Sequence, residues 1–303
     1  MAEQSLYFTA ISETLKDLRK VLTSAGIEER HLHFGGELPS EGKVFVPTDA
    51  RSEFLANRAM GDWAEEKLSE AISVEENLKF ATVHYGDSDS TSAGDPGFKE
   101  QYLKSKEETR LYGKRPDLLL FENGIKIPND ISLLPRAEAD DFARKAKVAI
   151  EVRSSKQQAL KYMAVKKAES EATGKKVGKI GLSFTVKVED LCIVYRWLEV
   201  CQIPQLYAQV FFDSVFSINV IDIFRIISSG SGFTFEKPEK SQNKATLMIP
   251  ITSGKQIGTF EVQPRFDVEI RENKTGRIDP FVKPVGGELK LDSLSLKEVI
   301  NAI

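Results

Sequence analysis

The chain has 303 residues and nearly balanced charges, with 42 Lys and Arg residues against 45 Asp and Glu residues and a formal net charge of −3. This balance excludes a histone-like or polybasic nucleic-acid protein, and 41% hydrophobic residues suffice for a sizeable core. Two cysteines exclude a disulfide framework, and neither a membrane span nor a secretory signal is evident, so we expect a soluble, cytoplasmic protein.

Hydrophobic periodicity predicts a chain in which helices and strands alternate. In chain order we expect a helix at 6–25, a helix at 53–73, a strand at 80–85, a helix at 98–112, strands at 117–121 and 147–152, a helix at 157–172, a strand at 179–186, a helix at 188–201, a strand at 206–212 and a helix at 220–227. After these elements, Gly, Pro and β-branched residues indicate hairpins. The whole chain, 1–303, is therefore expected to form a single α/β domain with a core at about 53–227, an N-terminal helical region at 1–52 and a β-rich C-terminal extension at 228–303.

Two acidic residues stand out because they lie on apolar strands. Asp117 opens one strand, and Glu151 lies near the end of another. Strand alternation places Arg153 on the same face as Glu151. A buried carboxylate needs a compensating cation, which a divalent metal or a nearby Arg would supply. Two carboxylates from neighbouring strands, with a backbone carbonyl, form a hard oxygen site that suits Mg²⁺.

Three segments resemble the signature of the PD-(D/E)xK nucleases. They are RPDLLLF, which contains Asp117, AIEVRSS, which contains Glu151, and GDWAEEKL at residues 61–68, which is similar to the G-x-x-x-E helix of these enzymes. Over about residues 61–212 the chain most resembles the Type II restriction endonucleases. The resemblance implies a mixed central sheet flanked by helices and Mg²⁺-dependent hydrolysis of both strands of double-stranded DNA at a short sequence, usually by a homodimer.

The resemblance also assigns roles to individual residues. It implies that Asp117, Glu151 and the backbone of Val152 bind the metal. Arg153 stands where the family has Lys, and because arginine stays protonated it stabilises an anion but does not serve as a general base. Lys156, three residues further on, is the alternative cation for the site. An ordinary ion pair between Glu151 and Arg153 is the competing interpretation.

The helix at 53–73 offers two glutamates as the further acid of the site. At about 100° per residue, Glu65 lies on the flank of the apolar face, whereas Glu66 lies nearly opposite it. We therefore expect Glu65 to be the metal ligand or the assisting acid, and Glu66 to be solvated.

Positive charge is concentrated in residues 144–187, where twelve basic residues stand against three acidic ones. The net charge of this segment is +9, which leaves −12 for the rest of the chain. This pattern is typical of a surface that binds a polyanion, although a solvated Lys-rich helix would also produce it. Because the segment adjoins Glu151, we expect it to contact DNA phosphates. The candidate DNA-binding residues are Lys156, Gln157, Lys161, Lys166, Lys167, Lys175 and Lys176.

The leading hypothesis is a sequence-specific DNA endonuclease in which Asp117 and Glu151 bind Mg²⁺, Glu65 assists, and Arg153 or Lys156 stabilises the transition state. The alternatives are a relaxed-specificity repair or recombination nuclease, a DNA-binding protein that has lost catalysis, and a protein-interaction module whose motif arose by chance.

Overall fold

Helices and strands alternate along the first part of the chain, and strands dominate the last part. The computed structural model describes residues 2–40, 42, 44–86, 91–174, 181–236, 244–273 and 276–302. Its helices are α1 (Ala2–Ser24), α2 (Ser52–Val74), α3 (Phe98–Tyr112), α4 (Arg136–Ala143), α5 (Ala159–Thr173), α6 (Val188–Cys201), α7 (Val220–Ser228) and α8 (Ser293–Asn301). Its strands are β1 (Phe80–His84), β2 (Leu118–Glu122), β3 (Val148–Ser154), β4 (Ser183–Lys187), β5 (Gln205–Val210), β6 (Ser214–Asn219), β7 (Thr234–Glu236), β8 (Thr246–Pro250), β9 (Lys255–Val262), β10 (Arg265–Glu272), β11 (Ile278–Val285) and β12 (Glu288–Leu291).

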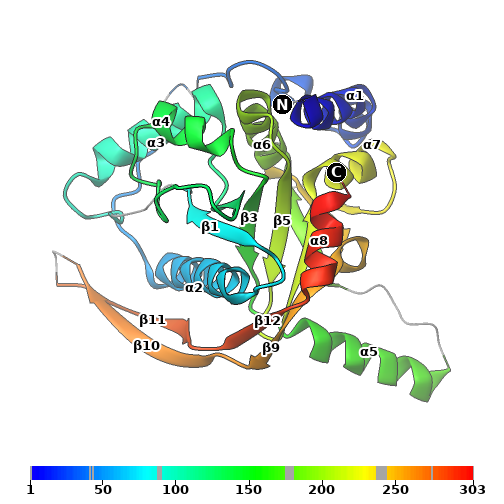
Figure 1. Cartoon of the computed structure of the whole chain (residues 1–303). Coiled ribbons are helices and arrows are strands. Elements are labelled where there is room, and N and C mark those ends of the chain that lie inside the picture. The colour runs from blue at the N-terminus through cyan, green and yellow to red at the C-terminus, as the bar shows by residue number, and fades with distance from the viewer. Residues whose placement is uncertain are drawn as a thin grey trace.

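The centre of the protein is a seven-stranded mixed sheet in the order β1-β2-β3-β5-β6-β9-β12. Strands β3 and β5 pair in parallel, and the other neighbouring strands pair antiparallel. Figure 1 shows α2 covering one face of this sheet and α6 lying on the other. The expected mixed sheet flanked by helices is therefore confirmed.

Strand alternation explains why both faces of the central sheet are buried. In β2, Leu118 and Leu120 belong to the core on the α2 side, whereas Leu119 and Phe121 belong to the core on the α6 side. A strand that is buried on both faces is a continuous apolar run, and the segment LLLF has that pattern. This burial fixes the register that brings the start of β2 beside the middle of β3.

The C-terminal extension expected at 228–303 is β-rich, but much of it belongs to the core. Strands β9 and β12 complete the central sheet, and α8 packs against β9 and β6. The remaining strands form two smaller sheets, β4-β8-β7 and the two-stranded ribbon β10-β11. A boundary at residue 228 thus separates no structural layer, because β9 pairs with β6 from the core expected at 53–227.

The ribbon β10-β11 runs beneath α2 (Figure 1) and contacts it mainly through β11. The face toward α2 is mixed: Arg271 pairs with Asp95 at 2.8 Å and Ser52 bonds to Asp279, while Phe281 packs against the small apolar cluster that contains Leu55. Its other face is apolar apart from Glu272 at one end, and the large apolar side chains exposed there are Phe266, Val268, Ile270, Ile278 and Val282. The ribbon therefore presents exposed hydrophobic side chains on this face, and Phe266 at its other end also packs against Phe212.

Helix α5 projects away from the body of the protein (Figure 1) and is anchored at its first turn. Ala159 is the one buried residue of this helix. The carboxylate of Asp213, in the turn between β5 and β6, accepts hydrogen bonds from the backbone N–H groups of Ala159 at 2.7 Å and Lys161 at 3.1 Å. This contact satisfies donors that a helix leaves free at its N-terminus, so Asp213 sets where α5 begins.

Candidate active site

A cleft of about 950 Å³ opens where the start of β2 meets the middle of β3. The strands align because Leu118 pairs with Ile150, which places Asp117 beside Glu151 at the next step of the antiparallel register. Asp117, Glu151, Val152, Arg153, Lys156 and Glu65 all line this cleft. The structure thus brings together every residue for which the sequence suggested a catalytic role.

The two strand carboxylates are held by different partners. Asp117 Oδ2 accepts a hydrogen bond of 2.6 Å from the backbone N–H of Val152. The Glu151 side chain is only 4% exposed, and its Oε1 contacts Lys114 Nζ at 2.6 Å. Val152 therefore meets the carboxylate cluster through its N–H group, whereas the sequence suggested a contribution through its carbonyl.

Lys114 is a site residue that the sequence analysis missed. Its Nζ contacts the carboxylates of both Glu151, at 2.6 Å, and Asp117, at 3.7 Å. Burial lowers the pKa of Lys114, but the negative charges of Glu151 and Asp117 outweigh it and raise that pKa above its ordinary value. The available signal was a lysine three residues before Asp117 in the segment KRPD.

The position of Lys114 depends on a tight turn at the end of α3. Gly113 has a φ of +77°, and a Cβ at this residue would lie 2.3 Å from the backbone nitrogen of Trp197. Only glycine avoids both the left-handed strain and this clash. The Gly113 carbonyl also accepts a hydrogen bond of 3.0 Å from the buried Arg136, so the turn that delivers Lys114 to the cleft is fixed.

Helix α2 supplies the third acid of the cleft. Its apolar face, which includes Trp63, Ala64 and Leu68, packs against the sheet. Glu65 lies in the cleft, whereas Glu66 points to solvent with its side chain 60% exposed. The orientation predicted from helix geometry is confirmed for both glutamates.

Burial and mutual repulsion raise the pKa values of two of these acids. Burial is the main cause for Glu65, and the charge of Asp117 adds to it, so that the pKa of Glu65 rises to about 8. Burial and the charge of Glu151 likewise raise the pKa of Asp117 to about 6. Carboxylates crowded in this way favour a cation among them.

The donor set of the cleft suits a hard divalent cation. Among the residues that the structure describes, no three His, Cys, Asp or Glu side chains are already gathered as a metal-binding group. Mg²⁺, however, needs only one or two protein carboxylates and keeps water and substrate phosphate as its other ligands. Asp117 and Glu151 supply two carboxylates at one point, and the ammonium group of Lys114 contacts both, so these residues fit a bound cation.

Arg153 and Lys156 occupy different parts of the cleft. The Arg153 guanidinium lies 3.2 Å from Glu151 Oε1 and 3.5 Å from Asp190 Oδ2, and it lies over the Tyr207 ring at 5.9 Å. Burial lowers the pKa of Arg153, but the charge of Glu151 more than offsets it, so the net pKa is raised and the group stays charged. Lys156 lies past the end of β3 as an exposed residue at the cleft.

The basic segment at 144–187 does not form one continuous surface. Lys145 and Lys147 precede β3 and line a separate hollow near α1 and α7, whereas Lys156 follows β3 and lines the cleft. The seven residues of β3 separate the two groups by about 23 Å. The expectation of a single DNA-binding surface is therefore wrong, because β3 carries the chain from one end of the sheet's strands to the other.

The remaining candidate DNA-binding residues lie on or beside α5. Lys161 and Gln157 are exposed near its first turn. Lys166 pairs with Glu169 at 2.7 Å and Lys167 with Glu171 at 4.0 Å, which offsets part of their charge. Lys175 and Lys176 lie outside the residues that the structure describes.

A cleft in which carboxylates and cations meet beside a mixed sheet is suited to phosphodiester hydrolysis, the reaction of the nuclease class. The sequence profile of the AccI restriction endonuclease family matches residues 31–178 and 171–302. These matches span most of the chain, and the protein therefore belongs to the AccI restriction endonuclease family, as the resemblance to Type II restriction endonucleases predicted. Its activity is sequence-specific cleavage of DNA. No curated protein and no solved structure matches the chain.

Within the described ranges, no helix combines the length and the apolarity that crossing a bilayer requires.

Proposed function

We propose that the cleft between β2, β3 and α2 is the active site and that it hydrolyses both strands of DNA with Mg²⁺, as in the PD-(D/E)xK nucleases. Asp117 and Glu151 hold the metal, and Glu65 is the assisting acid. The observation that carries the proposal is the contact of Lys114 Nζ with the carboxylates of both Asp117 and Glu151, because a position that accepts one cation between two carboxylates accepts another. When bound there, Mg²⁺ would activate water and offset the charge that develops on the phosphate.

The cations of the cleft then act on the phosphate. Lys114 has a flexible four-carbon side chain and can leave Glu151 for the scissile phosphate while the rest of the site stays in place. Arg153 is held by Glu151 and Asp190, so it stabilises negative charge from a fixed position. Lys114 thus joins Arg153 and Lys156 as a candidate for the role that the family gives to its motif lysine.

Contacts to the DNA backbone outside the catalytic centre come from the lysines that follow β3. Lys156 at the cleft and Lys161 at the first turn of α5 bind phosphates that flank the cut. Such contacts supply affinity and register but carry no base information. Asp213 supports them indirectly, since its hydrogen bonds fix the start of α5.

Cleavage of both strands requires two active sites, and the enzyme acts as a homodimer. The apolar face of the β10-β11 ribbon supports this assembly, because Phe266, Val268 and Ile270 are each more than half exposed. Glu272 is the charged residue among the described residues of this face, and its negative charge disfavours DNA as the partner. A second copy related by a two-fold axis would place the same apolar residues opposite it.

Plasmid cleavage tests the site assignment. With Mg²⁺, the wild-type protein is expected to give discrete bands, whereas Asp117→Asn and Glu151→Gln should lose cleavage because each removes a metal-binding charge. Glu66→Gln, which changes an exposed residue on the same helix, is the matched control and should cut normally. Equal cleavage by wild type and both strand variants would refute the site. A smear would indicate a nonspecific nuclease, and retarded but uncut DNA would indicate a binding protein without catalysis.

A further inference from the structure

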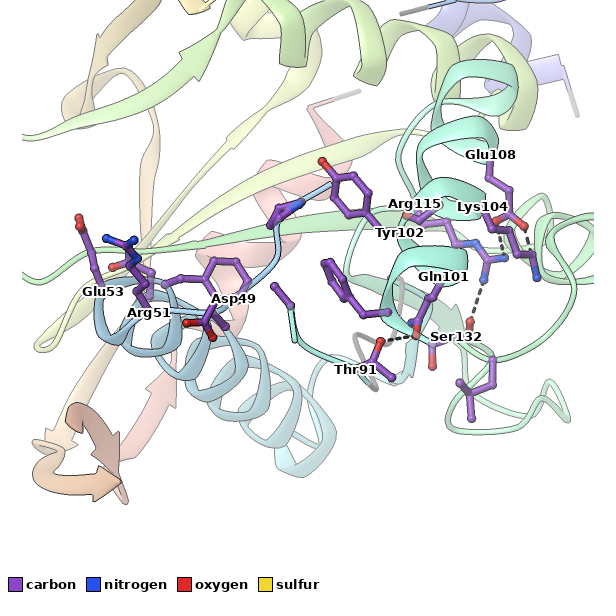
Figure 2. Close-up of a pocket in the computed structure, with 18 of the residues that line it drawn as sticks. Asp49, Arg51, Glu53, Thr91, Gln101, Tyr102, Lys104, Glu108, Arg115 and Ser132 are labelled. Atoms are coloured by element: carbon purple, nitrogen blue, oxygen red, sulfur yellow. Dashed lines mark hydrogen bonds and ion pairs between the residues drawn. The ribbon is translucent and has the colours of Figure 1, made fainter. Parts of the chain in front are cut away.

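A second hollow, with a volume of about 850 Å³, continues the active-site cleft along α2 and α3. The two hollows share lining residues, namely Phe54 and Asn57 from α2, Tyr102 and Ser105 from α3, and Ser132 from the loop after β2. Figure 2 shows the second hollow, with Asp49, Arg51 and Glu53 at the beginning of α2 on one side and Gln101 and Tyr102 of α3 on the other. The second hollow therefore extends the active-site cleft into a groove between two helices.

One stripe of α2 runs along both hollows. Phe54, Asn57, Gly61 and Glu65 follow one another at spacings of three and four residues, so they share a face of the helix. Asn57 precedes Glu65 by eight residues, which is about 12 Å along the helix axis. With about 3.4 Å between successive base pairs, that distance corresponds to about three or four base pairs from the cut.

The facing helix, α3, has no buried residue. Its half-buried side chains Gln101, Tyr102 and Ser105 line the second hollow, while Lys99 and Glu100 do not line it and are exposed to solvent. Thr91 Oγ1 donates a hydrogen bond of 2.7 Å to Gln101 Oε1 (Figure 2), which holds that side chain in one orientation. Helix α3 therefore presents polar side chains to the groove and contributes no buried residue to the core.

Positive and negative side chains around the second hollow are equal in number: Arg51, Lys104 and Arg115 against Asp49, Glu53 and Glu108. Arg115 lies 3.7 Å from Glu108 and donates a hydrogen bond of 3.0 Å to the Ser132 carbonyl, and Lys104 lies 3.8 Å from Glu108. Phosphates are therefore attracted less here than at Lys156 or Lys114. The hollow is also lined by neutral amides and hydroxyls, and these residue types recognise base edges.

We infer that Asn57 and Gln101 are specificity-determining residues that read base edges in this groove, each through its side-chain amide. The amide of Asn or Gln matches the N6 and N7 atoms of adenine, so the inferred targets are A·T pairs within a few base pairs of the cut. The inference rests on the proposed active site, because the position of the carboxylates determines which part of the DNA enters the groove.

The test uses Asn57→Ala and Gln101→Ala in the full-length protein, with Glu100→Gln on the outer side of α3 as the matched control. Fragment ends are sequenced after limited digestion of a randomised DNA library with Mg²⁺. Each alanine variant should lose its preference at one A·T position, with discrimination there reduced about 10- to 100-fold. The control should cut the same sequences as wild type. Unchanged sequence preference in both alanine variants would overturn the inference.

A binding measurement separates this result from a failure of the active site. Without divalent metal, wild-type protein should prefer its own site over a site with that A·T pair replaced, and the alanine variants should lose the preference. If wild type binds selectively but does not cut, the proposed function fails and the groove assignment stands. If the variants bind with undiminished selectivity, the groove assignment fails, whatever the cleavage result. Two controls show that any loss comes from the missing amide: Asn57→Gln keeps an amide at this position, and thermal melting shows whether the alanine variant is folded. Asn57 is exposed and not part of the core, so the alanine variant should melt as wild type does.

Discussion

Lys114 Nζ lies 2.6 Å from Glu151 Oε1, although the two residues come from different elements and are 37 positions apart. The contact puts a lysine at the carboxylates on which a metal is expected. In the proposed site a divalent cation would compete with Lys114 for Glu151, and the lysine would be displaced toward the phosphate when metal and DNA bind.

Replacing Lys114 by Met should separate these two effects. Cleavage by the variant is expected to fall by about 100-fold or more, because a cation beside the developing charge is removed. Its Mg²⁺ affinity without DNA should rise, because no ammonium group opposes the metal. Single-turnover cleavage and calorimetric titration measure the two quantities. Lys106→Met, at another lysine of the cleft, is the control. Normal cleavage by Lys114→Met would show that the lysine only fills the site.

Arg153→Lys tests how the second cation acts. If charge alone matters, the variant should retain most of the cleavage rate, because lysine preserves the positive charge near Glu151. A large loss would indicate that the planar guanidinium makes a bidentate phosphate contact that lysine does not reproduce. The rate is measured at saturating Mg²⁺, so that a change in metal affinity does not enter the comparison.

Glu65→Gln should stabilise the metal-free protein at high pH. Folding raises the pKa of Glu65 from 4.5 to about 8, so the protonated form is favoured in the fold. The stability that this gives is complete below pH 4.5 and is lost as the pH rises through 8. Because Glu65 is only half-buried, we expect a modest gain of about 2–4 °C in Tm at pH 8.5 and a smaller one at pH 5.

Melting curves in a chelator measure this difference, and Glu66→Gln should show no such pH dependence. Added Mg²⁺ should reduce the difference in Tm between Glu65→Gln and wild type, because the metal stabilises the wild type. A Glu65→Gln variant that melts lower than wild type at pH 8.5 would contradict the crowding of carboxylates in the cleft.

Several elements could be predicted from the sequence because local patterns decide them. The expected helices at 98–112 and 188–201 coincide with α3 and α6, whose ends are marked by residues in the left-handed region, Gly113 and Gln202. Strand β6 was missed because it is buried on both faces, and SVFSIN lacks the alternation that marks a half-buried strand. Helix α4 was missed because it is short, with only eight residues.

Strand and helix geometry predicted some residues of the site, and the others depend on tertiary contacts. Asp117 and Glu151 were found because acids on apolar strands are costly, and Glu65 because it flanks an apolar helix face. Lys114 was missed because its contact depends on the Gly113 turn against α6, which no spacing encodes. The separation of Lys147 from Lys156 depends on β3 crossing the sheet, which charge counting along the chain ignores.

The salt dependence of DNA binding should distinguish the two groups of lysines. Replacing Lys156 and Lys161 by Ala should reduce the slope of log K against log salt by about 0.9 for each phosphate that the protein no longer neutralises. Replacing Lys145 and Lys147 by Ala is the matched control, because these residues lie beyond the other end of β3 and should leave the slope unchanged. Filter-binding titrations from low to moderate salt measure it. Equal slopes for both double variants would contradict the placement of DNA over the cleft.

Val268→Lys should weaken the proposed homodimer and change the products of cleavage. The substitution puts a charge in the middle of the apolar face of the β10-β11 ribbon, where Val268 is 69% exposed, so folding should be unaffected while association suffers. Light scattering should show a monomer at concentrations where wild type is a dimer. Plasmid digestion should then accumulate nicked circles, because a monomer carries one active site and cuts one strand at a time. Asp267→Asn changes the net charge equally on the same strand and should behave as wild type. A wild-type protein that is monomeric while linearising plasmid would rule out the ribbon as a dimer interface.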